Sequence, residues 1–82
     1  MFLSIIVPTH QRLGLLLACL ESVHVHAPKE TEVIVVDDAS PQPVTQTVCA
    51  RFPSVRVLRL PRHRGFCAAA NAGIAAAQGE IV

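Results

Sequence analysis

Hydrophobic residues in this 82-residue chain fall alternately in short continuous runs and in helical spacings. The runs at 5–7 and 33–36 are apolar throughout, which is typical of parallel strands covered on both faces. Leu13, Leu16 and Leu20 instead recur at helical spacing. The pattern predicts a strand over 3–7, a helix over 12–25, a strand over 32–36, a helix over 44–52, a strand over 55–60, a helix over 66–78 and the start of a strand at 81.

Strict alternation of strands and helices predicts an α/β fold. We expect a Rossmann-like, three-layer αβα architecture with a mostly parallel sheet, wound by right-handed crossovers. A chain this short forms at most one small domain and buries only about 60% of its unfolded surface. Because residues 79–82 read as the opening of a strand rather than a domain end, we expect residues 1–82 to be the N-terminal part of a larger domain whose sheet is incomplete here.

Composition excludes some classes. Apolar residues make up 51% of the chain and charged residues 16%, which favours a packed core over disorder. The net charge of +1 gives no electrostatic basis for nucleic-acid binding. We interpret the short basic cluster as a phosphate-facing loop or a solvated turn rather than a duplex-binding patch; it consists of Arg59, Arg62, His63 and Arg64.

The chain also lacks targeting signals. No segment reaches the ~20 apolar residues that a transmembrane helix needs. The N-terminal apolar run has neither the basic start nor the length of a signal peptide. We therefore predict a cytoplasmic protein, with membrane association possible only through downstream segments of a longer parent.

Three cysteines stand far apart, at Cys19, Cys49 and Cys67. Their apolar or alanine-rich neighbours predict buried, reduced thiols on helices. A zinc site formed by Cys19, His24 and His26 is an alternative, but its spacing matches no common zinc motif. No sequence feature marks a partner that would activate a catalytic cysteine.

Polar residues concentrate where the predicted strands end. In a parallel sheet the loops that follow the strands gather at one edge, and ligands bind there. That edge would bring together Pro8-Thr9-His10, Asp37-Asp38 and the loop 61–65. We therefore predict a ligand site built from these three segments.

The adjacent carboxylates of Asp37 and Asp38 are the sharpest local signal. An ionised carboxylate accepts hydrogen bonds from a ribose hydroxyl or a base N–H, and such bonds contribute roughly 1.5–3 kcal/mol each. The alternative is that one aspartate caps the following turn, with help from Ser40. We assign Asp38 to ligand binding, whereas Asp37 stays open between a ligand contact and a structural role.

The loop 62–65 leads directly into a predicted helix, whose free backbone N–H groups and dipole favour a phosphate. Gly65 allows a positive φ or a close backbone approach. A plain strand-to-helix turn is the alternative. Within the helix, the small residues at 68–73 allow close packing on the sheet. Asn71 interrupts them, and a buried amide there needs partners, either on a neighbouring loop or near a diphosphate.

Two common nucleotide motifs are missing. The dinucleotide-binding Gly-x-Gly-x-x-Gly should follow the first strand, but that place holds Pro8-Thr9-His10-Gln11-Arg12; the Gly-x-x-x-x-Gly-Lys-Ser/Thr loop is absent too. Four segments, in order and with ordinary spacing, instead resemble family 2 glycosyltransferases of the GT-A fold. They are SIIVPTHQR at 4–12, LESV at 20–23, EVIVVDDAS at 32–40 and GFCAAANAGIAAAQGE at 65–80.

The resemblance implies transfer of a sugar from a nucleotide-diphosphate donor to an acceptor hydroxyl, usually with inversion. Pro8 and Thr9 correspond to the loop against the base and ribose, and Asp38 to the carboxylate that holds the uracil or other base. His10 and Gln11 stand where a Tyr-Asn pair is commoner, so His10 either stacks on the base or is a solvated loop residue.

The resemblance also places three residues near the diphosphate, namely Arg64, Gly65 and Asn71. The family's Asp-x-Asp motif, which binds Mg²⁺ or Mn²⁺, would come a few residues after Val82, and the general base much farther on. Asp37-Asp38 is not that motif, since it follows the second strand rather than the fourth. We therefore predict neither catalytic nor metal-binding residues within 1–82, and no activity for the chain alone.

Two rival functions remain open. One is a non-catalytic nucleotide-binding or assembly module. The other is a different nucleotide-sugar enzyme, such as a nucleotidyltransferase, which would need a glycine-rich loop after the first strand. The nucleotide, sugar and acceptor depend largely on segments beyond Val82.

Overall fold

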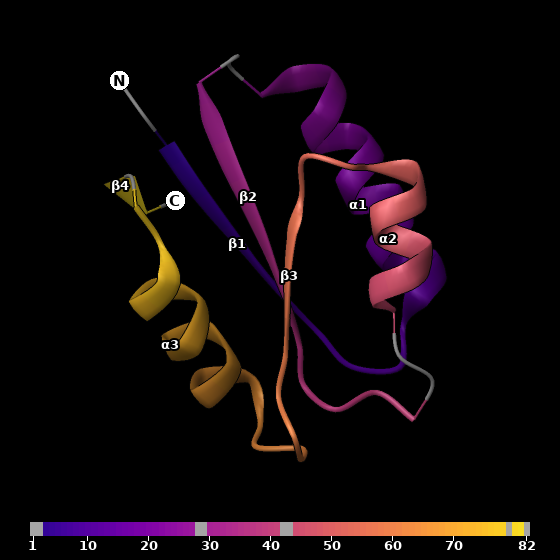
Figure 1. Ribbon diagram of the computed structural model, residues 1–82, viewed down its shortest axis with the longest axis vertical. Helices are drawn as coiled ribbons and strands as arrows, with labels where there is room; N and C mark the ends of the chain where they lie inside the picture. Colours follow the sequence, from indigo (N-terminus) through magenta and orange to yellow (C-terminus); the bar gives the residue numbers. More distant parts are fainter. Residues whose placement is uncertain (1–2, 28–29, 42–43, 79, 82) are drawn as a thin grey trace.

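A parallel sheet forms the centre of the molecule (Figure 1). The computed structural model describes residues 3–27, 30–41, 44–78 and 80–81. Within these residues, four strands pair in the order β3-β2-β1-β4, all parallel. Their bounds are Leu3–Thr9 for β1, Thr31–Asp37 for β2, Arg56–Arg59 for β3 and Glu80–Ile81 for β4.

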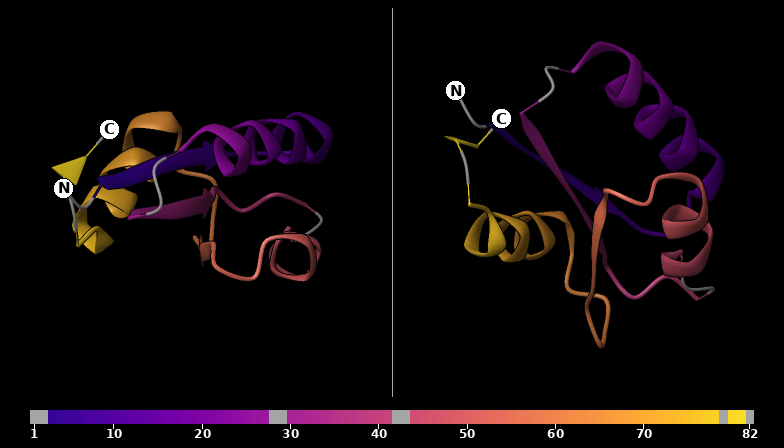
Figure 2. Two further views of the ribbon diagram at one scale, coloured as in Figure 1. Left: turned by 90° about the horizontal axis from the view of Figure 1, so that it is seen from above. Right: turned by 45° about the horizontal axis from the view of Figure 1, so that its top comes forward.

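Three helices cover the two faces of this sheet. They are α1, Leu13–His26; α2, Thr45–Arg51; and α3, Phe66–Ala76. The chain winds from β1 through β2 to β3 and then returns across the sheet to β4, beside β1. Because such crossovers are right-handed, this reversal puts α1 and α2 on one face and α3 on the other (Figures 1 and 2). The predicted three-layer α/β class is confirmed.

The central strand β2 is buried on both faces. Ile34, Val35 and Val36 have no exposed surface. Successive side chains of a strand point to opposite faces, and the packing follows this alternation. Ile34 and Val36 lie with Ala69 of α3. Val35 lies in the other cluster, whose buried members are Leu16, Leu20, Val44, Val48 and Phe52. The apolar run at 33–36 therefore needs cover on both sides, as its pattern predicts.

β1 continues to Thr9, two residues beyond its predicted end, and includes Pro8. Alternate residues of a parallel strand direct their backbone groups to opposite neighbours. The Thr9 carbonyl accepts a 2.8 Å hydrogen bond from the Asp38 N–H, so Thr9 faces β2. Pro8 consequently faces the β4 side, where the described pairing involves only Leu3 and Ser4. Its missing N–H therefore removes no ladder bond.

α3 ends at Ala76, two residues earlier than predicted, because a carboxylate accepts a hydrogen bond from the backbone that follows the helix. Glu32 accepts a 3.0 Å hydrogen bond from the Gln78 N–H and a 2.8 Å bond from the Ser4 hydroxyl. Arg56 donates to Glu32 at 3.1 Å and to the Ala76 carbonyl at 3.2 Å. One acidic side chain thus joins three strands to the end of α3. The predicted strand residue Val82 lies outside the described residues.

All three cysteines are exposed, so the prediction of buried thiols is wrong. Each lies on a helix, but none is covered by the sheet. On α3, for example, Ala69 and Gly73 face the sheet, and Cys67 stands about 200° around the helix from Ala69. Apolar neighbours in the sequence therefore did not reveal the orientation of the cysteines.

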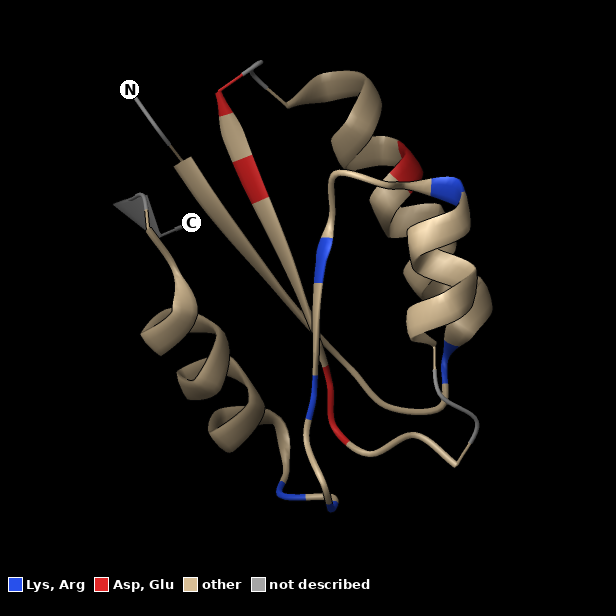
Figure 3. Cartoon of the chain, viewed as in Figure 1, with Lys and Arg blue, Asp and Glu red and all other residues tan. Residues whose placement is uncertain are grey.

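Charged residues avoid α3 and gather on the strands, their loops and the other two helices (Figure 3). The carboxyl end of β2 is acidic and faces basic residues of β3 and the loop after it. α3 carries no charged residue, but its 11 residues are too few to span a membrane. In the described part of the chain, no helix has the length and apolar character to cross a membrane.

Gly73 sets how closely α3 approaches the sheet. A Cβ at this position would collide with Cγ2 of Ile6 and lie 3.0 Å from Cγ2 of Val36. We expect Gly73→Ala to lower the free energy of unfolding by about 1–3 kcal/mol, because α3 must move away from a packed core.

Gly14→Ala is the matched control, since a Cβ at Gly14 of α1 would meet nothing within 4 Å. We expect it to raise stability by about 0.5–1 kcal/mol through helix propensity. Urea denaturation of both variants provides the measurement. Equal effects at the two glycines would contradict the close contact at Gly73.

Candidate functional site

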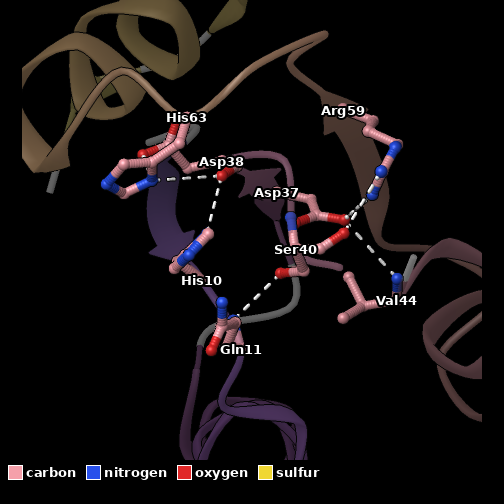
Figure 4. A network of polar contacts seen from close by, with 8 residues as sticks. All are labelled: His10, Gln11, Asp37, Asp38, Ser40, Val44, Arg59 and His63. Carbon is pink, nitrogen blue, oxygen red and sulfur yellow. Dashed lines mark hydrogen bonds and ion pairs between the residues drawn. The ribbon is translucent and has the colours of Figure 1, made fainter. Parts of the chain in front are cut away.

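Loops that follow β1, β2 and β3 meet at the carboxyl edge of the sheet (Figure 4). His10 comes directly after β1, Asp38 directly after β2, and His63 from the loop between β3 and α3. Residues 53 positions apart in the sequence are therefore brought side by side, and the rings of His10 and His63 have centroids 4.2 Å apart. The three segments singled out in the sequence form one cluster.

Asp38 holds this cluster together. Its side chain is buried, and its two carboxylate oxygens accept 2.8 Å hydrogen bonds from the backbone N–H groups of Arg64 and Gly65. Gly65 is the N-cap of α3, has φ of 94° and carries no side chain to cap the helix. Asp38, which directly follows β2, instead binds the backbone just before the first turn of α3. Two N–H groups of the predicted phosphate-facing loop, those of Arg64 and Gly65, are therefore already bonded.

Electrostatics keep Asp38 ionised. Burial raises the pKa of this carboxyl, but the N–H groups of Arg64 and Gly65 and the nearby His63 and His10 rings outweigh it, and the pKa lies below its ordinary value. An ionised carboxylate only accepts hydrogen bonds. At neutral pH, Asp38 therefore selects for donor groups.

Two imidazole rings border Asp38 (Figure 4). His10 Nδ1 lies 2.8 Å from the Asp38 carbonyl oxygen, and His63 Nδ1 lies 3.0 Å from Asp38 Oδ2. Because both partners are oxygen acceptors, Nδ1 of each ring must carry the proton. The rings are tilted by 43° to one another. Their orientation is thus set by Asp38.

A pocket of about 210 Å³ opens beside these groups. Its wall combines one carboxylate with rings and small apolar groups. Phe66, the first residue of α3, is 72% exposed and provides a further aromatic face. The lining residues are Pro8, Thr9, His10, Asp38, His63, Phe66 and Ala69.

Asp37 has a different environment. Its side chain is completely buried and accepts a 2.9 Å hydrogen bond from the Ser40 N–H and a 2.8 Å bond from Arg59. A weaker contact of 3.5 Å comes from the Val44 N–H. Burial raises the pKa of Asp37, but the hydrogen bonds from Ser40, Val44 and Arg59 more than offset it, so the pKa is lowered. These contacts favour the structural alternative for Asp37.

Ser40 links the loops after β1 and β2. Its hydroxyl oxygen accepts a 3.0 Å hydrogen bond from the Gln11 N–H. Two residues of these loops have left-handed backbone angles, Gln11 with φ of 58° and Ala39 with φ of 57°. Such angles cost a non-glycine residue roughly 1–2 kcal/mol. The loops are thus held in a strained conformation by the hydrogen bonds around Asp37 and Ser40.

Of the residues predicted for the site, Pro8, Thr9, His10 and Asp38 line the pocket. Arg64 and Gly65 take part through their backbone N–H groups, whereas the Arg64 side chain is exposed. Asp37 and Asn71 do not line this pocket.

Asn71 is exposed on α3, so the premise of a buried amide is wrong. The alanines around it are half-buried, and Asn71 falls on the solvent side of the helix. Sequence reasoning included His63 only as a member of the basic loop and did not select Phe66. The signal for Phe66 was an aromatic ring at the predicted helix start, directly after Arg64-Gly65.

A parallel αβα sheet with its pocket at the carboxyl edge is the architecture of nucleotide-binding α/β proteins. The sequence profile described as Glycosyl transferase family 2 matches residues 4–82. The chain therefore belongs to glycosyl transferase family 2, and its fold is of the GT-A type.

Known proteins support this assignment. An "Uncharacterized glycosyltransferase" of Rickettsia felis is 27% identical over 81 residues, which cover 96% of this chain and 13% of that protein. The crystal structure of S. aureus TarS matches with a TM-score of 0.84 and 31% identity over 100% of this chain and 27% of the other. The mannosyltransferase PcManGT of Pyrobaculum calidifontis, in complex with GDP-Man and Mn²⁺, matches with a TM-score of 0.76 and 27% identity over 96% of this chain and 25% of its own.

TarS has also been solved with UDP and with UDP-GlcNAc, and both structures match this chain at 30% identity. The chain spans about a quarter of these solved relatives and 13% of the curated one.

A divalent metal, present in the PcManGT structure, does not fit the carboxylates described here. Asp37 is paired with Arg59 inside the protein, and Asp38 is bonded to two backbone N–H groups. Among the described residues, no three His, Cys, Asp or Glu side chains are arranged to hold a metal ion, and this includes the suggested cluster of Cys19, His24 and His26.

Stability should depend on pH through three carboxyl groups. The pKa values of Glu32, Asp37 and Asp38 are all lowered in the folded chain. Their contribution is complete above the unfolded values, 4.5 for Glu and 3.8 for Asp, and is lost as the pH falls through the lower folded values. We expect the free energy of unfolding to be level near neutrality and to fall below about pH 4.5.

Urea denaturation between pH 3 and 7 measures this dependence. Asp37→Asn should be less stable by about 1–3 kcal/mol at pH 7, because buried donors lose an acceptor. Its free energy of unfolding should also fall less than that of the wild type as the pH is lowered. A stability that stays level down to pH 3 would contradict the three shifts.

Backbone strain at Ala39 can be tested separately. We expect Ala39→Gly to raise the free energy of unfolding by up to about 1 kcal/mol, because glycine adopts positive φ without steric cost. In the exposed part of α3, Ala75→Gly should instead lower it by about 1 kcal/mol. Thermal unfolding of the two variants measures these effects. Equal destabilisation of both would contradict backbone strain at Ala39.

Proposed function

We propose that this chain is the donor-nucleotide-binding part of a glycosyltransferase that moves a sugar from a nucleotide diphosphate to an acceptor hydroxyl. Family membership supports the reaction class. The observation that carries the proposal is the ionised Asp38 in the wall of a pocket at the carboxyl edge of the sheet.

The chemistry of Asp38 indicates which bases fit. An acceptor-only carboxylate needs a ligand N–H or O–H. At the ring nitrogen of the pairing edge, uracil and guanine carry an N–H, whereas cytosine and adenine present a lone pair and donate only through an exocyclic amino group. A ribose hydroxyl is the alternative donor and would not distinguish the bases. UDP and GDP nucleotides, found with TarS and PcManGT, are of the N–H class.

Other residues have supporting roles in this proposal. Pro8 and Thr9 form the wall against the base and ribose, and the ring of His10, oriented by the Asp38 carbonyl, stacks on the base. Arg64 and Asn71 are exposed and lie on the diphosphate side, where a guanidinium pairs well with phosphate oxygens.

We further propose that the metal-binding Asp-x-Asp and the general base lie in parts of a longer protein outside residues 1–82. The metal, when bound there, would neutralise the leaving diphosphate. In this division of roles, residues 1–82 bind and orient the donor, and sugar transfer requires the rest of the enzyme.

Calorimetric titration of the chain with UDP, GDP, CDP and ADP tests the site. We expect UDP or GDP to bind more tightly than CDP and ADP, and Asp38→Asn to weaken the preferred nucleotide about tenfold or more, because a charge-assisted hydrogen bond is lost.

Glu21→Gln is the matched control. It removes an exposed carboxylate of α1, remote from the pocket, and should leave affinity unchanged. Circular dichroism must show that Asp38→Asn is folded. Equal binding of all four nucleotides would contradict base reading by Asp38, and sugar transfer by the chain alone would contradict its catalytic incompleteness.

A further inference from the structure

The carboxylate expected to meet the ligand is covered in the structure. The Asp38 side chain is only 4% exposed although it lines the pocket. The N–H groups of Arg64 and Gly65 donate hydrogen bonds to it, and His63 Nδ1 lies 3.0 Å from Oδ2 and 3.4 Å from the Asp38 carbonyl oxygen. A carboxylate offers about four acceptor positions, so little capacity remains for a ligand.

The three donors differ in how easily they can leave. Arg64 and Gly65 donate from the backbone directly before α3, so breaking those bonds requires the chain at the helix start to move. His63 contacts Asp38 through a side chain that is 59% exposed on the loop between β3 and α3. When this ring moves away, water can hydrate it. His63 is therefore the donor that a ligand can displace at low cost.

We propose that His63 acts as a latch on the nucleotide pocket: its imidazole occupies, on Asp38 Oδ2, the position that a ligand donor takes. Ligand binding moves the ring of His63 outward, while His10 keeps its hydrogen bond to the Asp38 carbonyl. This inference rests on the proposed function, because it assumes that the ligand reaches Asp38. His63 thus sets both affinity and the requirement for a donor group.

Protonation strengthens this latch. The groups around His63 are Asp38 from the end of β2, His10 from the end of β1, and Arg62 and Arg64 on its own loop. A charged His63 forms an ion pair with ionised Asp38, so the ligand must compete with a stronger contact. The ligand therefore meets stronger competition at low pH, and affinity should be higher at pH 8 than at pH 5.5.

Uridine separates this effect from attraction to phosphate. A protonated His63 or His10 would attract the phosphates of UDP and favour binding at low pH, which is the opposite sign. Uridine carries no phosphate and keeps the ring N–H. The latch therefore predicts weaker uridine binding at pH 5.5 than at pH 8.

The experiment is a titration of uridine and UDP, followed by NMR, at pH 5.5, 6.5 and 8. For His63→Ala we expect uridine to bind about two- to fivefold more tightly than to wild type at pH 5.5, the range that corresponds to removing an ion pair with one exposed partner. Its affinity should change little with pH. His63→Asn retains a neutral donor and should also lose the pH dependence, with a smaller gain in affinity.

His26→Ala is the control, since His26 is an exposed residue at the far end of α1. It should retain the wild-type affinity and pH dependence. The imidazole signals of His63 should shift on uridine binding to the wild type, which tests the latch even if His63→Ala fails to fold.

The outcomes separate the two proposals. If wild type binds uridine but His63→Ala binds it no more tightly, or the His63 signals do not move, the latch is refuted and the proposed function stands. If neither wild type nor any His63 variant binds uridine or UDP, the proposed function fails and the latch with it.

Discussion

Two adjacent carboxylates at the end of β2 organise the carboxyl edge of the sheet. Asp37 is the last residue of β2 and Asp38 directly follows it, and their side chains have different partners (Figure 4). Asp37 is buried with Arg59 and the N–H of Ser40 and holds the loop toward α2. Asp38 binds the backbone directly before α3 and orients the rings of His10 and His63. Neighbouring residues of one type therefore have different surroundings, because one carboxylate is buried with Arg59 and the other lines the pocket.

Asp38 also couples the position of α3 to the pocket. The chain directly before α3 is held by the Asp38 carboxylate, and the end of α3 by the Glu32 and Arg56 network at the other end of the sheet. Between them, Gly73 allows the helix to approach the sheet closely. Phe66 thereby reaches the pocket wall. Packing along the whole helix decides where one aromatic ring of the site lies.

Much of the fold could be read from the sequence. The apolar run at 33–36 and the leucine spacing of α1 identified these elements. A strand buried on both faces is apolar throughout, whereas a helix buried on one face has apolar residues at helical spacing. Local signals failed where a distant residue intervened. α3 ends at Ala76 because the Gln78 N–H donates a hydrogen bond to Glu32 instead of continuing the helix. Cys19 is exposed because the orientation of its helix, and not the apolar character of its sequence neighbours, decides burial.

For the site, the sequence determined which residues gather at one edge, since parallel strands bring their carboxyl ends together. It thereby predicted Thr9, His10 and Asp38 for the edge at which they line a pocket. Only the tertiary structure decided their roles. It turned Asp37 inward, used the N–H groups of Arg64 and Gly65 to bind Asp38, and placed His63 over the carboxylate. Hydrogen bonds between residues about 25 positions apart set these roles, and such pairings leave no periodic pattern in the sequence.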